Sequence, residues 1–355
     1  MKAGAFASGR MHGTPKISVI VPARDEEASI GACLRSILSS DYPDFEVIAV
    51  NDRSDDTTGQ IMRRIAAEDA RLRVVDIAGL PDDWLGKPHA MQTAAELADG
   101  EYLLFTDGDV IFHPELISRT AGFAAETETD HLSLLPKQIP GLFMENALFA
   151  YFAMMGLIAL QPNRIRTASK RSAAGIGAFN MVRRTAFDAV GGFHAVKYDP
   201  VDDYKLGLLL KRAGFRQRLL TAEGLLTVQW FSGVSGFVRV TEKNFFAAMR
   251  YSLPLSLLAG GLQFLSHAIP YAGLVFAQGA SVSGYLAAAI TMHGLLAYIG
   301  IRGGAGWKVT LLLPVSAGIM AFSLFRSAYK TLRQKGIFWR GRFYPLEKLR
   351  KGLVR

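Results

Sequence analysis

The segment Glu101-Tyr-Leu-Leu-Phe-Thr-Asp107-Gly108-Asp109-Val-Ile-Phe112 decides how this chain is organised. Its apolar first half is typical of a buried strand, and the strand ends in two aspartates separated by one glycine. In a parallel sheet this end lies at the carboxyl edge, where open α/β folds bind their ligands. Glycine permits a sharp turn, so Asp107 and Asp109 can face one divalent cation and a diphosphate. A lone Asp-Gly-Asp more often marks a simple turn, so the rest of the chain has to decide.

The composition divides the chain into a mixed part and an apolar part. Of the 355 residues, 50% are hydrophobic, and the formal net charge is +9. Charged and apolar residues mix up to about residue 250, whereas Arg302 and Lys308 are the only charged residues between Leu253 and Phe325. This apolar part indicates membrane segments. Much of the positive excess lies in the tail that follows, which favours anionic lipid headgroups over nucleic acid as a partner, and we find no nucleic-acid motif.

Strands and helices alternate before the Asp-Gly-Asp segment. The apolar spacing predicts strands over residues 17–21, 45–50, 73–77 and 102–106, with helices over 26–38, 58–69 and 88–98. Such alternation implies right-handed crossovers and a mostly parallel sheet. The single cysteine, Cys33, cannot form an internal disulfide, which is compatible with a reducing cytoplasm. Residues 1–15 lack the apolar core of a signal peptide and are expected to form a disordered leader.

Four motifs, in this order, resemble the signature of family 2 inverting glycosyltransferases, which have the GT-A fold and use a nucleotide-diphospho-sugar. They are Val19-Ile-Val-Pro22-Ala-Arg-Asp25-Glu26-Glu27, then Val50-Asn-Asp52-Arg-Ser-Asp55-Asp56-Thr57, then Asp107-Gly108-Asp109, then Asp202-Asp203 before Leu206-Gly207 and Arg212-Ala-Gly214. The resemblance covers roughly residues 16–250. Trp84-Leu-Gly86-Lys87-Pro-His89-Ala90 and the later apolar block resemble the membrane-bound subset that glycosylates lipids, such as ceramide, carotenoid and hopanoid-associated transferases.

The resemblance implies a donor site and a metal site. Up to residue 109, the expected donor-binding residues are Pro22, Ala23, Glu26, Asp52, Lys87 and Asp107. The expected ligands of Mg²⁺ or Mn²⁺ are Asp107 and Asp109. Asp52 would accept hydrogen bonds from the uracil or ribose of the donor. Lys87 precedes a helix, where its charge either meets the donor diphosphate or is simply solvated after a glycine turn.

The pair Asp202-Asp203 is the expected catalytic site. Inverting transfer needs one carboxylate to take the proton from the acceptor hydroxyl as it attacks the anomeric carbon. By resemblance to the family's acidic pair, whose second member is the base, Asp203 has this role. The alternative is that both acids cap the helix predicted over residues 204–213. Upstream, Gly175 and Gly177 are expected to let the backbone approach a sugar closely.

One element departs from the family pattern. The membrane branch continues with Gln/Arg-x-x-Arg-Trp, whereas this chain has Gln229-Trp230, followed by Arg239 and Lys243 at wider spacing. We carry over only Gln229 and Trp230 as donor-side contacts. Arg239 and Lys243 can serve the leaving group or, equally, lipid headgroups.

The sequence predicts a membrane part behind the catalytic domain. A GT-A domain over residues 16–250, with an interfacial or core helix over 142–160, is followed by a transmembrane region over 251–327 and a basic tail over 328–355. The apolar segments 253–278, 282–301 and 309–325 are each long enough to cross or nearly cross a bilayer. Three crossings would put the basic tail outside the cell, so we expect one re-entrant or interfacial segment and a cytoplasmic tail.

The predicted protein is therefore a multi-pass enzyme of the cell (inner) membrane, with its catalytic domain facing the cytoplasm. It transfers one sugar from a nucleotide-diphospho-sugar, with UDP as the expected nucleotide, to a lipid, with inversion and a divalent cation. Two alternatives remain at this point: a processive polysaccharide synthase of the same family, and a non-catalytic lipid-binding relative. The short membrane part disfavours the first, and the presence of all three acidic motifs disfavours the second.

Overall fold

The computed structural model of the chain describes residues 14–139, 141–167, 169–170, 172–222 and 224–354. The predicted leader, residues 1–15, lies outside the described residues except for Thr14 and Pro15. The chain forms two compact units. The first contains Met1–Lys137, Leu160–Gln229 and Gly352–Arg355, and the second contains Gln138–Ala159 and Trp230–Lys351. Contacts within a unit do not decide where a membrane begins, so the predicted boundaries at residues 250 and 327 stay predictions.

The first unit is built on one sheet. Its strands are β1 (Ile17–Ala23), β2 (Phe45–Asn51), β3 (Leu72–Asp76), β4 (Tyr102–Phe105), β6 (His131–Leu135), β8 (Asn180–Arg183) and β9 (Gln217–Thr221). They lie in the order β3-β2-β1-β4-β8-β6-β9, and only β8 runs against its neighbours. The prediction of a mostly parallel sheet is confirmed. Two short strands, β5 (Val110–Phe112) and β10 (Leu226–Val228), pair antiparallel beside it.

Helices connect these strands. They are α1 (Ile30–Leu38), α2 (Thr58–Glu68), α3 (Gly86–Leu97), α4 (Leu116–Glu126), α6 (Pro162–Ile165), α7 (Arg184–Ala189), the 3₁₀ segment η2 (Gly192–Val196) and α8 (Asp202–Arg212). The first helix begins four residues later than predicted. The Glu26 N–H donates to the Thr58 hydroxyl at 2.8 Å, so this part of the chain is bound to the start of α2 and forms a loop. Pro22 is tolerated at the end of β1 because the pairing with β4 already ends at Ile20.

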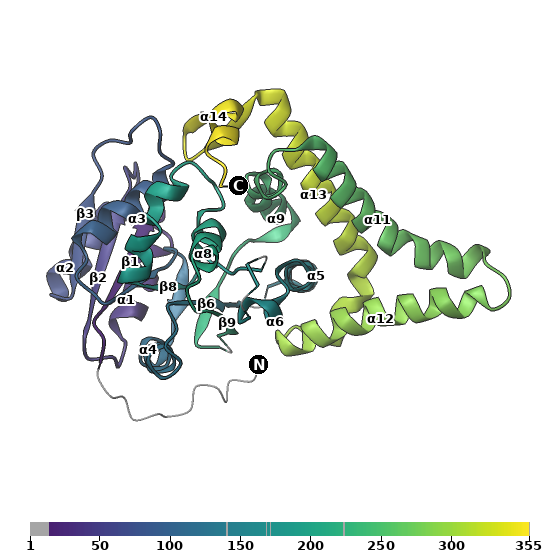
Figure 1. Cartoon of the computed structure of the whole chain (residues 1–355), viewed down its shortest axis with the longest axis horizontal. Coiled ribbons are helices and arrows are strands. Elements are labelled where there is room, and N and C mark those ends of the chain that lie inside the picture. The colour runs from purple at the N-terminus through teal and green to yellow at the C-terminus, as the bar shows by residue number, and fades with distance from the viewer. Residues whose placement is uncertain (1–13, 140, 168, 171, 223, 355) are drawn as a thin grey trace. The chain divides into compact units, whose positions relative to one another are not determined.

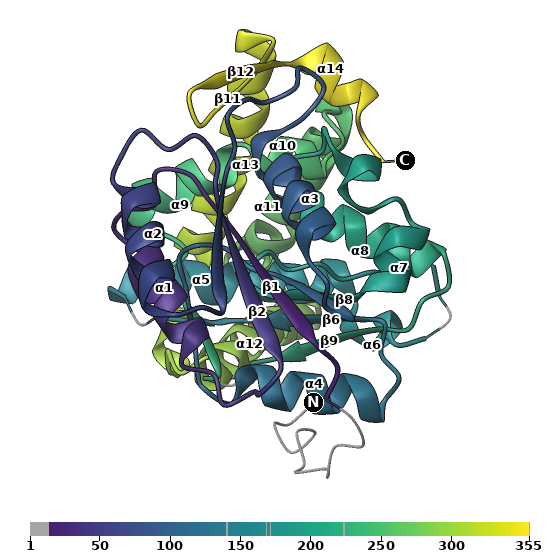
Figure 2. The same ribbon diagram turned by 90° about the vertical axis from the view of Figure 1, so that its left-hand side faces the viewer.

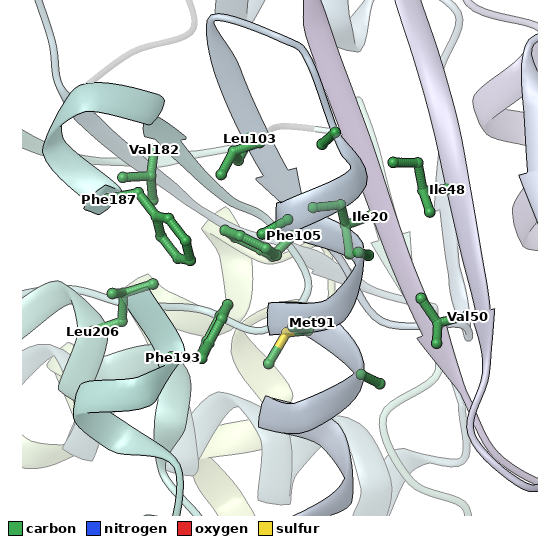
Figure 3. Packing of buried hydrophobic residues seen from close by; sticks show 14 of the residues in the cluster. Ile20, Ile48, Val50, Met91, Leu103, Phe105, Val182, Phe187, Phe193 and Leu206 are labelled. Atoms are coloured by element: carbon green, nitrogen blue, oxygen red, sulfur yellow. The ribbon is translucent and has the colours of Figure 1, made fainter. Parts of the chain in front are cut away.

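The core of the first unit joins α3 to the carboxyl half of the sheet. Helix α3 packs on β1 and β2 (Figure 2). Figure 3 shows Met91 of this helix in one cluster with the strand residue Phe105, which also contacts two further rings. The Phe105 centroid lies 4.8 Å from that of Phe193, edge to face, and 5.4 Å from that of Phe187. These aromatic contacts fix the end of β4 and therefore the turn that follows it.

The second unit is mainly helical. It contains α5 (Phe143–Leu160) up to Ala159, α9 (Gly233–Glu242), α10 (Asn244–Ala248), α11 (Leu253–Phe276), α12 (Ser281–Arg302), η3 (Trp307–Leu312), α13 (Leu313–Gln334), β11 (Gly336–Trp339), β12 (Arg342–Pro345) and α14 (Leu346–Lys351). Figure 1 shows α11, α12 and α13 as long helices of this unit.

Three helical stretches of the described chain are long and apolar enough to cross a membrane: Phe143–Leu160, Ser281–Arg302 and Trp307–Gln334. Two of them overlap the predicted segments 282–301 and 309–325, and the first is the helix for which we expected an interfacial or core position. The third predicted segment, 253–278, forms α11. This helix carries polar side chains that are bonded within the unit: the Tyr151 hydroxyl lies 3.1 Å from both His267 Nε2 and Gln263 Nε2.

Candidate active site

The Asp107-Gly108-Asp109 turn lies at the carboxyl edge of the sheet, as predicted. It follows β4, which runs parallel to β1. A Cβ atom added to Gly108 would lie 3.4 Å from the Ala23 side chain and 3.4 Å from Ile30, so the turn packs closely against the end of β1. The preceding residue, Thr106, donates its hydroxyl to the carbonyl of Ala178 at 2.7 Å. The turn is thereby held between the first strand and the loop before β8.

Lys87 lies among the acidic residues of this edge. Its ammonium group forms an ion pair with Asp107, and both side chains are partly exposed. Burial alone would lower the pKa of this lysine, but three carboxylates outweigh it and raise its pKa above the ordinary value. They are the carboxylates of Asp107, Asp202 and Asp203. Lys87 is therefore a permanent cation at the site, positioned by the first turn of α3.

Gly177 marks the point where these charges converge. A Cβ atom added there would lie 2.8 Å from Asp107 Oδ2, 3.2 Å from Lys87 Nζ and 3.4 Å from Asp203 Oδ2. Lys87 lies 90 positions before Gly177 in the sequence, and Asp107 lies 96 positions before Asp203. These residues nevertheless meet around the backbone of Gly177. The absence of a side chain at Gly177 keeps the space between the three charged groups open.

The Asp203 carboxylate is held by backbone donors. It accepts a hydrogen bond from the Tyr204 N–H at 2.7 Å and another from the N–H of Gly177. Burial raises the pKa of Asp203 above its ordinary value, and the positive charge of Lys87 opposes this rise. The result is a carboxylate that binds a proton more readily than an ordinary aspartate does, which suits a general base.

The loop over residues 174–177 packs directly on the first turns of α8. A Cβ on Gly175 would come within 1.9 Å of the carbonyl oxygen of Asp203, and a Cβ on Gly207 within 1.7 Å of the carbonyl oxygen of Ala174. We expected Gly175 and Gly177 to let the backbone approach a sugar. The structure gives Gly175 a different reason, which is close packing of the loop on α8, whereas Gly177 faces the charged groups.

The Gly177→Ala variant is expected to lose activity while it keeps its fold. The new methyl group would enter the space between Asp107, Lys87 and Asp203, where its nearest neighbours are side-chain ends that can move aside. Activity should fall by about tenfold or more, since displacement of reacting groups is costly, and the melting temperature should change little. The matched control is Gly79→Ala, since no atom lies within 4 Å of an added Cβ there. Full activity of Gly177→Ala would show that this space is not used.

A buried polar network lies beneath the loop. Gln217 of β9 donates to the carbonyl of Gly207 at 2.9 Å and accepts from the Ala174 N–H at 2.8 Å, so one side chain holds both α8 and the loop. Its amide also lies 2.6 Å from His131 Nδ1, and the other nitrogen of this histidine contacts the Asn180 side chain. Sequence reasoning missed this network. The only available signal was three polar residues at strand positions.

Stability should fall in acid because of His131. Burial lowers the pKa of this histidine to about 4, from an ordinary value of 6.5, so it stays neutral in the folded chain. In the unfolded chain this histidine takes up a proton below about pH 6.5. The contribution of neutral His131 to the free energy of unfolding is therefore complete above that pH and is lost as the pH falls toward 4. The loss is on the order of 3 kcal/mol. Melting temperatures measured from pH 7.5 to 4.5 should therefore fall less steeply for His131→Gln. The exposed His113→Gln variant should follow the wild type.

Asp52 is buried beside the start of α3. Its carboxylate pairs with the neighbouring Arg53, Nε to Oδ1 at 2.8 Å, and a Cβ on Gly86 would lie 2.5 Å from its other oxygen. Its N–H donates to the carbonyl of Ala23 at 2.8 Å, which brings Asp52 next to the end of β1 that also contains Pro22. The predicted donor loop and Asp52 therefore lie together, and their contact with a nucleotide stays a prediction.

The aspartates of the turn fit a divalent cation. Burial and the negative charges of Asp107 and Glu26 raise the pKa of Asp109 to about 7. A cation between the two carboxylates would relieve this repulsion, and Asp and Glu oxygens are the ligands that Mg²⁺ and Mn²⁺ prefer. Within the described residues, no third His, Cys, Asp or Glu side chain joins such a pair to complete a group of three metal ligands. Two carboxylates would therefore share the ion with oxygens of a diphosphate or of water.

Gln229 lies near the same turn. It follows Val228, which pairs with Val110 in the antiparallel contact of β10 and β5. Val110 comes directly after Asp109, so the register places the backbone of Gln229 across from the second aspartate. This proximity is compatible with the predicted donor-side role of Gln229, which stays a prediction.

Two further predicted residues have less direct placements. Asp202 is buried in the first turn of α8, and its charge acts on Lys87. Trp230 belongs to the second unit, where its ring lies 4.6 Å from that of Phe152 and 6.2 Å from that of Phe237. Its predicted contact with the donor stays a prediction.

Comparisons with known proteins give a consistent result. The model of the family described as Glycosyl transferase family 2 matches residues 18–191. The 4,4'-diaponeurosporenoate glycosyltransferase of Staphylococcus aureus is 27% identical over 194 residues, which are 54% of this chain and 50% of that protein. The chain thus spans about half the length of the curated relatives it matches.

Solved structures can be aligned with most of the chain. The mannosyltransferase PcManGT from Pyrobaculum calidifontis, in complex with GDP-Man and Mn²⁺, aligns with a TM-score of 0.56 at 20% identity, over 91% of this chain and 89% of that one. Staphylococcus aureus TarS aligns with a TM-score of 0.44 at 18% identity, over 92% of this chain and 95% of that one. The first of these likenesses shows a shared fold.

Proposed function

Because residues 18–191 make this chain a member of glycosyl transferase family 2, with the GT-A fold expected from its motifs, we propose that it transfers one sugar from a nucleotide-diphospho-sugar to a membrane lipid, with inversion. The observation that carries the proposal is the meeting of Asp107, Lys87 and Asp203 around Gly177 at the carboxyl edge of the sheet. A cation, a carboxylate for the metal and a second carboxylate for the acceptor are the groups that this chemistry needs.

In the proposed reaction Asp203 is the general base. The acceptor hydroxyl oxygen forms a bond to the anomeric carbon while Asp203 takes its proton, and the bond from that carbon to the phosphate oxygen breaks on the opposite face. The nucleoside diphosphate leaves with the bonding electrons, so the configuration at the anomeric carbon inverts. The Gly177 and Tyr204 N–H groups hold the base in place. Because Asp203 acts as a base and the acceptor oxygen attacks the anomeric carbon directly, the proposed reaction has no covalent intermediate with the enzyme.

Lys87 and the aspartate turn serve the leaving group in this proposal. The diphosphate carries negative charge that grows as the bond breaks, and Lys87 is a fixed positive charge beside Asp107. We propose that Lys87 exchanges its contact with Asp107 for one with the diphosphate when the donor binds. Mg²⁺ or Mn²⁺ held by Asp107 and Asp109 would neutralise further charge on the two phosphates. Pro22, Ala23, Glu26, Asp52 and Gln229 would form the nucleotide side of the site.

Similar proteins support the proposed class of acceptor and indicate which donors have to be tested. A curated relative is named for glycosylation of diaponeurosporenoate, a carotenoid acid, which supports a lipid-like acceptor. The similar mannosyltransferase is bound to GDP-Man and Mn²⁺, so GDP-sugars have to be tested beside the UDP-sugars expected from the sequence. Three candidate membrane-spanning helices support a membrane location. We propose the cell (inner) membrane, with several crossings and with the catalytic unit and the basic tail on the cytoplasmic side.

The proposal is tested by mass spectrometry of lipids from cells with and without the gene. A lipid that is heavier by one sugar residue should be present only with the gene, and its mass and fragments would name the sugar and the acceptor together. Cells that produce the Asp203→Asn protein at the same level are the matched control and should lack this lipid. Identical lipid profiles in all three strains would count against lipid glycosylation.

A further inference from the structure

A short β-hairpin follows directly on a candidate membrane-spanning helix. The stretch Trp307–Gln334 ends at Gln334, and β11 begins at Gly336. Between them Lys335 has a φ of 54°, which ends the helix, and its carbonyl accepts from the N–H of Leu346 at 2.8 Å. This bond closes the base of the hairpin. If the apolar part of this helix, residues 309–325, spans the bilayer, the rest of the helix to Gln334 extends by about 14 Å through the headgroup region and brings the hairpin to the membrane surface.

The hairpin has one buried face and one exposed aromatic face. Ile337 pairs with Tyr344, and their side chains are 5% and 3% exposed. Phe338 pairs with Phe343 on the other face, where they are 65% and 38% exposed and their ring centroids lie 4.9 Å apart. The hairpin packs against α13 and α14, and Figure 2 shows β11 and β12 beside α14. Two adjacent phenylalanines are therefore held rigidly toward the outside.

The turn of the hairpin is also rigid. Its central residues are Arg340 and Gly341, with φ values of 47° and 76°. Positive φ at both central positions is the geometry that matches the twist of a two-residue hairpin. The next residue inward, Trp339, lies under the ammonium group of Lys243, 3.6 Å from Nζ to the ring centroid. The aromatic face is therefore preformed and does not need a partner to order it.

The charge around this face is mainly positive, and its acidic residue Glu242 is paired with Arg326 and Lys330. Residues 326–355 contain ten lysines and arginines and a single acidic residue, Glu347. Glu347 forms an ion pair with Lys351. Lys335, Arg340 and Lys348 have exposed side chains near the base or turn of the hairpin. Exposed aromatic rings with surrounding cations are the composition that binds a membrane interface with anionic headgroups.

We propose that the outer face of the β11–β12 hairpin is a membrane-binding surface that recognises anionic lipids. Phe338 and Phe343 lie between the lipid headgroups and the upper acyl chains, and the basic side chains face lipid phosphates. A cavity next to the hairpin, lined by Glu242, Lys243, Lys330 and Phe338 among others, has a volume of about 20 Å³. That is room for about one water molecule, so the lipid binds on the face and not inside a pocket. This inference depends on the proposed membrane location but not on sugar transfer.

The test measures how deep the hairpin lies in vesicles that contain the full chain. In a Cys33→Ala background, Phe338→Cys receives a spin label, and relaxation by oxygen is compared with relaxation by a water-soluble nickel chelate. Phe343→Cys is the second variant in case the first does not fold, and Arg64→Cys on the exposed face of α2 is the control in water. The label at position 338 or 343 should be reached by oxygen and protected from nickel, and the label at position 64 should be reached by nickel.

Changing the charge of the lipids tests the recognition of anionic lipids separately from the membrane contact itself. Protection from nickel should increase when phosphatidylglycerol is added to phosphatidylcholine vesicles, and Lys335→Gln with Arg340→Gln should abolish this increase. Equal access of nickel to positions 338 and 64 would overturn the membrane contact. Protection from both nickel and oxygen would mean that protein covers the face, which also overturns it. Protection that does not change with lipid charge would overturn the recognition of anionic lipids.

Discussion

Replacement of Asp203 by Asn is expected to lower kcat by about 10²–10⁴-fold, which is the usual contribution of a positioned general base. Asparagine keeps the shape of the side chain, and its carbonyl oxygen can still accept from the Tyr204 N–H, which donates to Asp203 at 2.7 Å. It cannot accept the proton of the acceptor. The dissociation constant of the donor should therefore stay the same, as measured by calorimetry on the preparation used for kinetics.

The pair Asp202 and Asp203 allows a clean control. Both residues lie in the first turn of α8, where an acidic side chain also stabilises a helix. Asparagine is as good a helix cap as aspartate, so a purely structural role predicts that Asp203→Asn leaves both rate and melting temperature unchanged. Asp202→Asn should reduce kcat much less than Asp203→Asn. If Asp202→Asn is the inactive variant, the roles within the pair are exchanged.

The pH dependence of the rate provides a second readout for Asp203. Burial raises the pKa of its carboxyl group above the ordinary value of 3.8. Only the ionised form can act as a base, so kcat should increase with pH through this raised pKa and then level off. The acidic limb should disappear in Asp203→Asn, whose residual rate should not depend on this group.

Asp109→Asn is expected to reduce turnover by about 10²–10³-fold or more, because a bound divalent cation contributes several kcal/mol to stabilising the charge on the phosphates. A readout independent of activity is the melting temperature. Mn²⁺ should raise the melting temperature of the wild-type protein, since it relieves the repulsion between Asp107 and Asp109. Asp109→Asn should show no such rise, whereas the exposed Asp41→Asn should behave like the wild type.

The stabilisation of the protein by Mn²⁺ is expected to depend on pH, because the pKa of Asp109 is raised to about 7 without metal. The folded chain holds a proton there that the unfolded chain releases above about pH 4, so this group stabilises the fold less as the pH rises toward 7. Mn²⁺ has to displace that proton at low pH but not at high pH. Its stabilising effect should therefore be larger at pH 8 than at pH 5. An effect of Mn²⁺ that is equal in wild type and Asp109→Asn would place the metal elsewhere.

The sequence predicted the strand-and-turn part of the site well, because that part depends on local patterns. The apolar run before Asp107 and the glycine after it determine β4 and its turn, and the structure contains both. The meeting of Lys87 with Asp203 was implied only by the order of the motifs, since 116 residues separate them. Their proximity depends on the glycines of the loop over residues 174–177, whose packing on α8 no local pattern reveals.

The network around His131 could not be predicted for a different reason. Its members lie on β6, β8 and β9, and their contacts exist only because the sheet has the order β8-β6-β9 with β8 reversed. Strand order is not contained in the alternation of apolar residues. The late start of α1 has a similar origin. The Glu26 N–H donates to Thr58 and the Glu27 N–H donates to Asp56, at and just before the start of α2, and these contacts take the place of the first predicted helical turn.

The most direct measurement of the central claim is sugar transfer by the purified full-length chain in vesicles made from lipids of its own host. UDP- and GDP-sugars with radiolabelled sugar are offered one at a time with Mn²⁺, and the label in the lipid fraction is compared with the nucleoside diphosphate released. We predict that one donor places label in the lipid fraction in equal amount to the released nucleoside diphosphate, and that Asp203→Asn does neither while still binding that donor. Equal transfer by Asp203→Asn, or label that enters only a water-soluble polymer, would contradict this account.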